Sequence, residues 1–159
     1  MAGPLFVALL LSAAPSLRVV SLPGLDLGTQ AALADGGSGG NGGPGAPPAF
    51  PAALEGVIAV TAVDVDGRLF EQANRGGYVD VAAPGVRVIA PAAGPETGTS
   101  FAAPFVTAWV AAMIAEGGPA DAAAMHRAIA VTARDLGPAG RDPDFGWGLL
   151  QSDGNCGRR

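Results

Sequence analysis

The fold is decided by one stretch of the chain, Gly98-Thr99-Ser100-Phe101-Ala102-Ala103-Pro104-Phe105-Val106. It joins a flexible turn to an apolar segment that we expect to be helical to about Glu116. Backbone N–H groups in the first turn of a helix have no intrahelical partner, and the helix dipole favours negative charge there. A hydroxyl at Ser100 is therefore well placed to act as a nucleophile, which favours acyl transfer. The alternative is that Ser100 only caps the helix, as serine often does.

The segment from Ser100 to Ala115 is apolar on every side of a helical wheel, and Thr107 is the only polar residue inside it. A helix that is apolar all round is normally buried in the middle of a domain. Pro104 lies early in this helix, where its missing N–H costs little. We therefore predict a buried central helix that starts at Ser100.

Strand and turn signals surround this helix. A nearly continuous β-branched run predicts a buried strand of a parallel sheet. Further strands, and a second helix with Met125 and Ile129 on its core face, are expected from periodicity. In chain order the predicted elements are a strand at 57–63, a strand at 78–82 closed by Ala83-Pro84-Gly85, a strand at 86–90 and a helix at 120–133. This order predicts an α/β fold with a mostly parallel sheet.

Composition limits the function. The chain has 159 residues, a net charge of −5, one cysteine and nine basic residues, all of them arginine. One domain fits this length, and the absence of a basic stripe argues against nucleic acid as a partner. Cys156 has no second cysteine in the chain with which to form a disulfide. No apolar run reaches the roughly 18 residues that a membrane helix needs.

The central stretch also resembles a known signature. Gly-Thr-Ser-x-Ala-x-Pro-x-Val is the serine motif of the subtilisin-like serine peptidases, and every fixed position matches here. Gly40-Asn41-Gly42-Gly43-Pro44 resembles the family's oxyanion-hole segment, and Ala83-Pro84-Gly85 resembles its turn ahead of the serine. Residues 142–149 are similar to its closing Gly-x-Gly segment.

The resemblance implies roles for several residues. Ser100 would be the nucleophile, and Asn41 would donate its side-chain amide to the oxyanion beside the backbone N–H of Ser100. Gly39, Gly40 and Thr99 would contact the substrate. The implied partner is a peptide or protein substrate, the implied location is secreted or periplasmic, and neither a cofactor nor a metal ion is implied.

The chain differs from the family at the catalytic base and at the carboxylate that orients this base. Such a serine needs a base and an orienting carboxylate, and the family order is Asp, His, Ser. The only histidine, His126, follows Ser100 and lies on the second predicted helix, where we expect a surface or core-edge position. Asp-Ser-Gly and Asp-Thr-Gly blocks are absent, and Asp80 is interpreted as structural. These 159 residues alone are therefore predicted to lack useful peptidase activity.

The predicted organisation follows from this partial match. Residues 1–40 form a poorly defined segment, a helix plus a Gly-rich loop; 41–150 are the C-terminal part of a subtilase catalytic domain, with a partial doubly wound sheet; and 151–159 are a flexible tail. An Asp/His-bearing N-terminal half would be the missing partner. Leu5–Ala14 resembles the h-region of a signal peptide, but no basic residue precedes it, which disfavours that interpretation.

Two other functions stay open. The first is a non-catalytic module that keeps the groove and binds peptides. The second is a different α/β protein that binds a nucleotide through Gly36–Gly43, although the lysine of a P-loop is absent. The Asp64–Gly67 segment is interpreted as a solvated turn rather than a metal loop.

Overall fold

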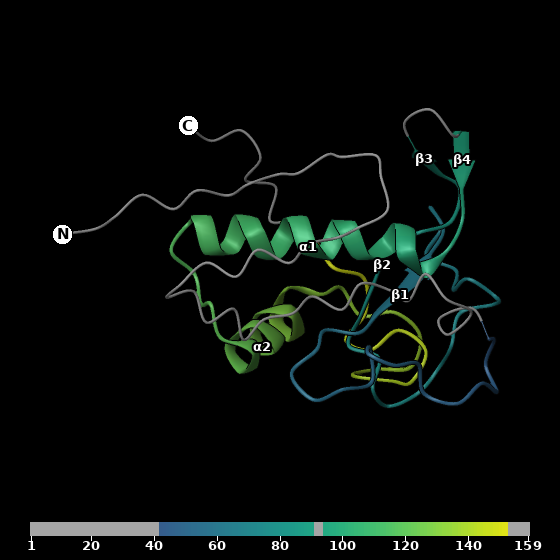
Figure 1. The fold of residues 1–159 in the computed structure, drawn as a ribbon, viewed down its shortest axis with the longest axis horizontal. Helices are drawn as coiled ribbons and strands as arrows, with labels where there is room; N and C mark the ends of the chain where they lie inside the picture. Colours follow the sequence, from purple (N-terminus) through teal and green to yellow (C-terminus); the bar gives the residue numbers. More distant parts are fainter. Residues whose placement is uncertain (1–41, 91–93, 153–159) are drawn as a thin grey trace.

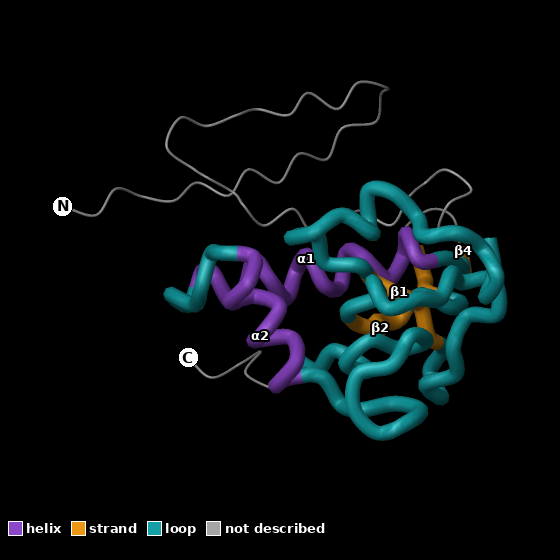
Figure 2. Tube along the Cα trace, turned by 90° about the horizontal axis from the view of Figure 1, so that it is seen from below, coloured by secondary structure: helices purple, strands orange, loops and turns teal. Residues whose placement is uncertain are grey.

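The computed structural model describes residues 42–90 and 94–152. These residues form a mixed α/β unit in the order β1 (Val60–Val63), β2 (Val81–Pro84), β3 (Val88–Ala90), β4 (Gly94–Glu96), α1 (Thr99–Ala115) and α2 (Ala122–Thr132). Figures 1 and 2 show α1 lying over the strands β1 and β2, with α2 beside it. The predicted helix at 5–17, most of the Gly-rich loop and the end of the predicted tail lie outside the described residues.

Strands β1 and β2 are parallel, with Val60 opposite Val81 and Val63 opposite Pro84. The predicted strand at 78–82 is wrong at its start, because β2 begins only at Val81. The preceding residues form a turn instead, in which the Val79 N–H donates to the Gly76 carbonyl at 3.0 Å. Three consecutive buried residues open β2, so its true signal is a continuous apolar run and not alternation.

The hairpin of β3 and β4 follows, with Val88 opposite Glu96 in an antiparallel pair. The strand predicted at 86–90 is confirmed for Val88–Ala90. β4 was not predicted, because Gly94 and Pro95 are both poor strand formers. Strand propensity therefore does not account for its pairing with β3.

Local hydrogen bonds close the C-terminus of α1 and the N-terminus of α2. The C-terminus of α1 is closed by Gly117, at φ 85°, and Gly118, whose N–H groups donate to the Ile114 and Met113 carbonyls at 3.0 and 2.8 Å. This pair of bonds is a Schellman motif, which satisfies carbonyls at the helix end. Asp121 caps α2 by accepting a bond from the Ala124 N–H at 2.8 Å.

The core lies between the two parallel strands and the two helices. The predicted core positions Met125 and Ile129 are both fully buried, which confirms the predicted face of α2. The buried cluster is made up of Ile58, Ala62, Val81, Ala83, Ala102, Val106, Val110, Met125 and Ile129. Because this cluster holds α1 against β1 and β2, it sets the position of the residues at the start of α1.

Candidate active site

Ser100 is the second residue of α1 and is exposed to solvent. The residue at the N-cap position is Gly98, and no side chain caps this helix. The idea that Ser100 is only a cap is therefore wrong. Its hydroxyl lies at the amino end of a 17-residue helix, where free N–H groups and the helix dipole favour a developing negative charge. The preceding Thr99 is buried, with only 4% of its surface exposed.

The serine turn is anchored to the carboxyl ends of both parallel strands through Gly85. The Gly98 N–H donates to the Gly85 carbonyl at 2.8 Å, and the Gly85 N–H donates to the Val63 carbonyl at 3.0 Å. A Cβ at Gly85 would lie 2.6 Å from Ala62 Cβ and 2.9 Å from the Gly98 carbonyl oxygen. A side chain at position 85 would clash with these atoms, so the Ala83-Pro84-Gly85 turn requires glycine at its last position.

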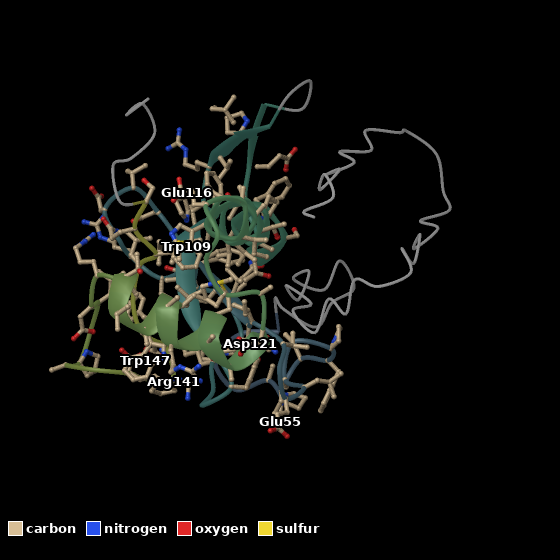
Figure 3. All side chains as sticks on the ribbon, turned by 90° about the vertical axis from the view of Figure 1, so that its left-hand side faces the viewer. Glu55, Trp109, Glu116, Asp121, Arg141 and Trp147 are labelled. Carbon is tan, nitrogen blue, oxygen red and sulfur yellow. The ribbon has the colours of Figure 1, made fainter. Side chains whose placement is uncertain are left out.

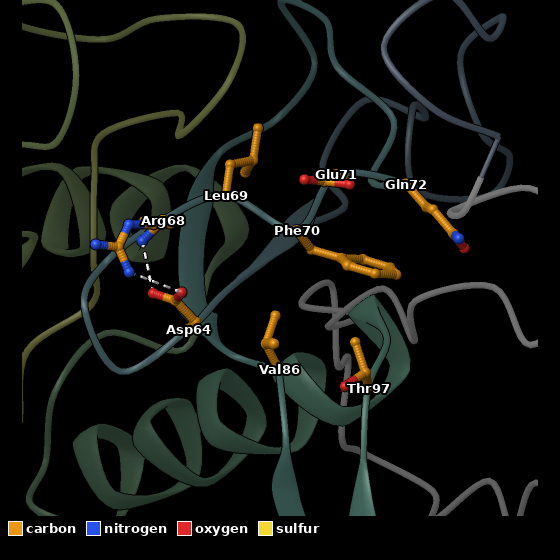
Figure 4. A pocket seen from close by; sticks show the side chains of 8 residues that line it. All are labelled: Asp64, Arg68, Leu69, Phe70, Glu71, Gln72, Val86 and Thr97. Atoms are coloured by element: carbon orange, nitrogen blue, oxygen red, sulfur yellow. Dashed lines mark hydrogen bonds and ion pairs between the residues drawn. The ribbon is translucent and has the colours of Figure 1, made fainter.

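A pocket of about 320 Å³ opens beside this turn. Figure 4 shows Phe70 on one side of it and Val86 and Thr97 on the other. Thr97 directly precedes Gly98, so the pocket adjoins the start of α1. The lining residues are Asp64, Arg68, Leu69, Phe70, Glu71, Gln72, Val86 and Thr97. The lining thus combines three apolar side chains with charged and polar ones, close to the turn that leads into Ser100.

The segment that follows Asn41 is held by a buried amide. Asn74, 6% exposed, accepts a bond from the Gly42 N–H at 2.8 Å and donates to the Pro47 carbonyl at 3.1 Å. The sequence pattern gave no signal for this role of Asn74. Asn41, Gly39 and Gly40 lie outside the described residues.

Asp80 is the centre of a second polar cluster. Its Oδ2 accepts from the Ala59 N–H at 2.9 Å, and its Oδ1 lies 3.1 Å from Arg141 Nη2 and 3.3 Å from His126 Nδ1. Burial raises the pKa of the Asp80 carboxyl above its ordinary value, and this effect outweighs the bond from Ala59 and the neighbouring His126 and Arg141 side chains, which lower the pKa. Figure 3 shows Arg141 and Trp147 together on the closing segment, and the Trp147 N–H donates to the Asp80 carbonyl.

This cluster lies at the opposite edge of the sheet from Ser100. Asp80 precedes the first residue of β2, whereas Gly85 follows its last residue and contacts the serine turn. At about 3.3 Å per residue, the strand separates these two ends by roughly 16 Å. His126 is therefore a core-edge histidine engaged with Asp80, and it cannot reach the Ser100 hydroxyl in this arrangement. The structural interpretation of Asp80 agrees with these contacts.

The remaining carboxylates of the described residues do not gather around a metal site. Asp64 Oδ1 accepts from the N–H groups of Asp66 and Arg68 in a tight turn, and Arg68 pairs with both carboxylates. Among residues 42–90 and 94–152, no cluster of three or more His, Cys, Asp or Glu side chains could hold a metal ion. Within the same ranges, neither helix has the length and hydropathy needed to span a bilayer.

Comparisons with known proteins agree with this geometry. The model of the subtilase family, peptidase S8, matches residues 36–148, and the chain therefore belongs to the subtilase family. A search of curated protein sequences found no match.

Solved structures of three proteins share the fold. The PatG macrocyclase domain is 30% identical with a TM-score of 0.57, over 72% of this chain and 39% of that domain. The prenylagaramide maturation protease PagA is 26% identical with a TM-score of 0.54, over 71% and 46% of the two chains. A lanthipeptide protease, 21% identical with a TM-score of 0.53, shares the fold over 64% and 40%. The chain thus spans less than half the length of each of these structures.

Proposed function

We propose that this chain is the nucleophile-bearing part of a subtilisin-like serine endopeptidase that hydrolyses peptide bonds. The observation that carries the proposal is the exposed Ser100 hydroxyl at the amino end of α1, within a complete serine motif. Ser100 attacks the scissile carbonyl, and its backbone N–H together with the Asn41 side-chain amide stabilises the oxyanion. Removing such a side-chain donor costs about 10²–10³ in kcat, a magnitude measured on subtilisin itself.

The substrate is a peptide or protein segment that lies along the serine turn. Gly39, Gly40 and the backbone of Thr99 contact it, and one of its side chains enters the pocket between Phe70 and Thr97. The support for this placement is that the pocket directly adjoins Gly98. The lining offers both apolar side chains, Leu69, Phe70 and Val86, and charged ones, Asp64, Arg68 and Glu71.

These 159 residues alone are proposed to be inactive, because His126 is held by Asp80 at the far edge of the sheet. A serine without its histidine base loses about 10⁶ in kcat, again a value measured on subtilisin. The base and its orienting acid are proposed to come from an Asp/His-bearing N-terminal half, encoded upstream or supplied by a second polypeptide.

The test is peptide hydrolysis with and without that half. The purified chain is incubated with a fluorogenic peptide, alone and with the polypeptide encoded immediately upstream of residue 1, and Ser100→Ala is the matched control in both arms. We expect turnover only in the combined arm, and only with Ser100 intact. Turnover by the chain alone that Ser100→Ala abolishes would refute the proposed inactivity, and equal turnover with Ser100→Ala in the combined arm would refute Ser100 as nucleophile.

A further inference from the structure

Arg87 has a backbone conformation that arginine does not favour. It directly precedes β3 and has a φ of 54°. Among residues 42–90 and 94–152, no other residue except glycine has a positive φ. A side chain crowds the backbone at positive φ, so glycine is the usual residue there, followed by asparagine and aspartate. Such strain persists where the surrounding structure enforces it, and it is common at functional sites.

The wall of the pocket holds Arg87 in this conformation. The Arg87 N–H donates to Thr97 Oγ1 at 2.9 Å across the base of the β3–β4 hairpin. Thr97 lines the pocket, and so does Val86, the residue before Arg87. Figure 4 shows Val86 and Thr97 on the same side of the pocket. Arg87 is thus fixed between two lining residues, and Thr97 leads directly into Gly98 and the serine turn.

Contacts among the described residues do not account for an arginine at this position. Arg87 is exposed, and its guanidinium forms no ion pair or hydrogen bond with residues 42–90 or 94–152. Arg68, which lines the same pocket, is instead paired with Asp64 and Asp66. An exposed arginine without an ion pair is not unusual in itself; Arg127 is another, but it lies in α2, where helical backbone suits arginine. At Arg87 the backbone is unfavourable as well, so glycine or asparagine would suit the fold better.

We propose that Arg87 recognises a carboxylate of the substrate at the rim of the pocket, on an acidic side chain or at the C-terminus of the peptide. This inference rests on the proposed function, because it places a peptide along the serine turn. A guanidinium presents paired N–H donors that match the two oxygens of a carboxylate. The bond to Thr97 fixes the backbone that carries this guanidinium, which reduces the entropy lost on binding. Arg87 is therefore a specificity-determining residue for peptides with a carboxylate near the residue that enters the pocket.

The experiment measures the binding of peptides with and without the carboxylate. The chain carries Ser100→Ala, so hydrolysis does not intervene, and is mixed with the polypeptide encoded immediately upstream of residue 1. Fluorescent peptide pools with glutamate or its uncharged isostere glutamine fixed at the centre, each with a free or an amidated C-terminus, are compared by anisotropy. The glutamate comparison tests an acidic side chain, and the C-terminal comparison tests the terminal carboxylate.

We expect one of these carboxylates to tighten binding about two- to fivefold, the range of one exposed ion pair. Arg87→Gln should abolish this preference. Arg127→Gln, the same change on the exposed surface of α2, should retain it. Arg87→Asn should melt at least as high as the wild type, because asparagine tolerates a positive φ and adds less freedom to the unfolded chain than glycine does.

The opposite results would overturn the proposal. They are equal binding of all pools, no binding of any pool, and a preference that survives Arg87→Gln. A lower melting temperature for Arg87→Asn would show that the arginine side chain supports the fold instead. Hydrolysis in the earlier assay without any carboxylate preference in binding would refute this inference and leave the proposed function intact. A carboxylate preference that depends on Arg87, without hydrolysis in the earlier assay, would refute only the proposed function.

Discussion

Replacing Asp80 with alanine should destabilise the fold by about 2 kcal/mol. The largest contribution is the buried Ala59 N–H, which loses its acceptor at 2.9 Å; an unsatisfied buried donor costs about 1–3 kcal/mol. The ion pairs add less, about 0–1 kcal/mol, because the Arg141 and His126 side chains are 37% and 29% exposed and regain water. Removal of the carboxylate also has a stabilising effect, which reduces the total loss. The burial that raises the pKa of Asp80 disfavours the ionised form, and the alanine variant no longer has this cost.

The assay is urea unfolding at low protein concentration, followed by the fluorescence of the two tryptophans. Asp66→Ala is the matched control, because the Asp66 side chain is 60% exposed and its ion-pair partner among the described residues, Arg68, is exposed as well. We expect Asp66→Ala to change the free energy of unfolding by less than about 0.5 kcal/mol. If Asp80→Ala costs no more than Asp66→Ala, the cluster around Asp80 does not hold β2, α2 and the closing segment together as we have reasoned.

The pH dependence of the same contribution has a definite sign. The pKa of Asp80 in the folded chain is raised above the ordinary 3.8, so the folded state favours the protonated carboxyl. The part of the stability that depends on protonation of Asp80 is therefore complete below pH 3.8 and is lost as pH rises through the folded pKa. Asp80→Asn cannot titrate, and the free energy of unfolding of the wild type minus that of Asp80→Asn should fall over this range. A difference that rises with pH would show that Arg141 and His126 outweigh burial.

Three further predictions concern the rest of the chain. Gly146→Ala should cost at least about 3 kcal/mol more than Gly140→Ala in urea unfolding, because both positions have positive φ but only at Gly146 would a Cβ meet backbone, 2.2 Å from the Asp80 carbonyl carbon. Asn74→Ala should increase hydrogen exchange at the Gly42 amide by about tenfold or more, and unchanged exchange there would show that the bond to Asn74 does not hold the loop. Finally, the isolated chain should melt broadly and depend on concentration because of the exposed apolar face of α1; a sharp melt of a monomer would contradict this.

Local chemistry allowed much of this fold to be predicted from the sequence. The extent of α1, its end near Gly117 and the core face of α2 follow from a continuous apolar run, a glycine at the helix end and apolar periodicity, all of which act within a few residues. The serine motif likewise placed Ser100 at the start of α1, because a glycine turn before an uncharged helix leaves little choice of geometry.

Contacts between distant segments were decided only by the tertiary structure. The start of β2 at Val81, the clasp of Asn74 on Gly42 and the three-way contact at Asp80 join residues that are far apart in the chain, so no local pattern encodes them. Helix α1 is the clearest case. The sequence determined that the helix is apolar all round, but which half is buried depends on where β1, β2 and α2 pack, because burial is a property of neighbours in space and not of the residues themselves.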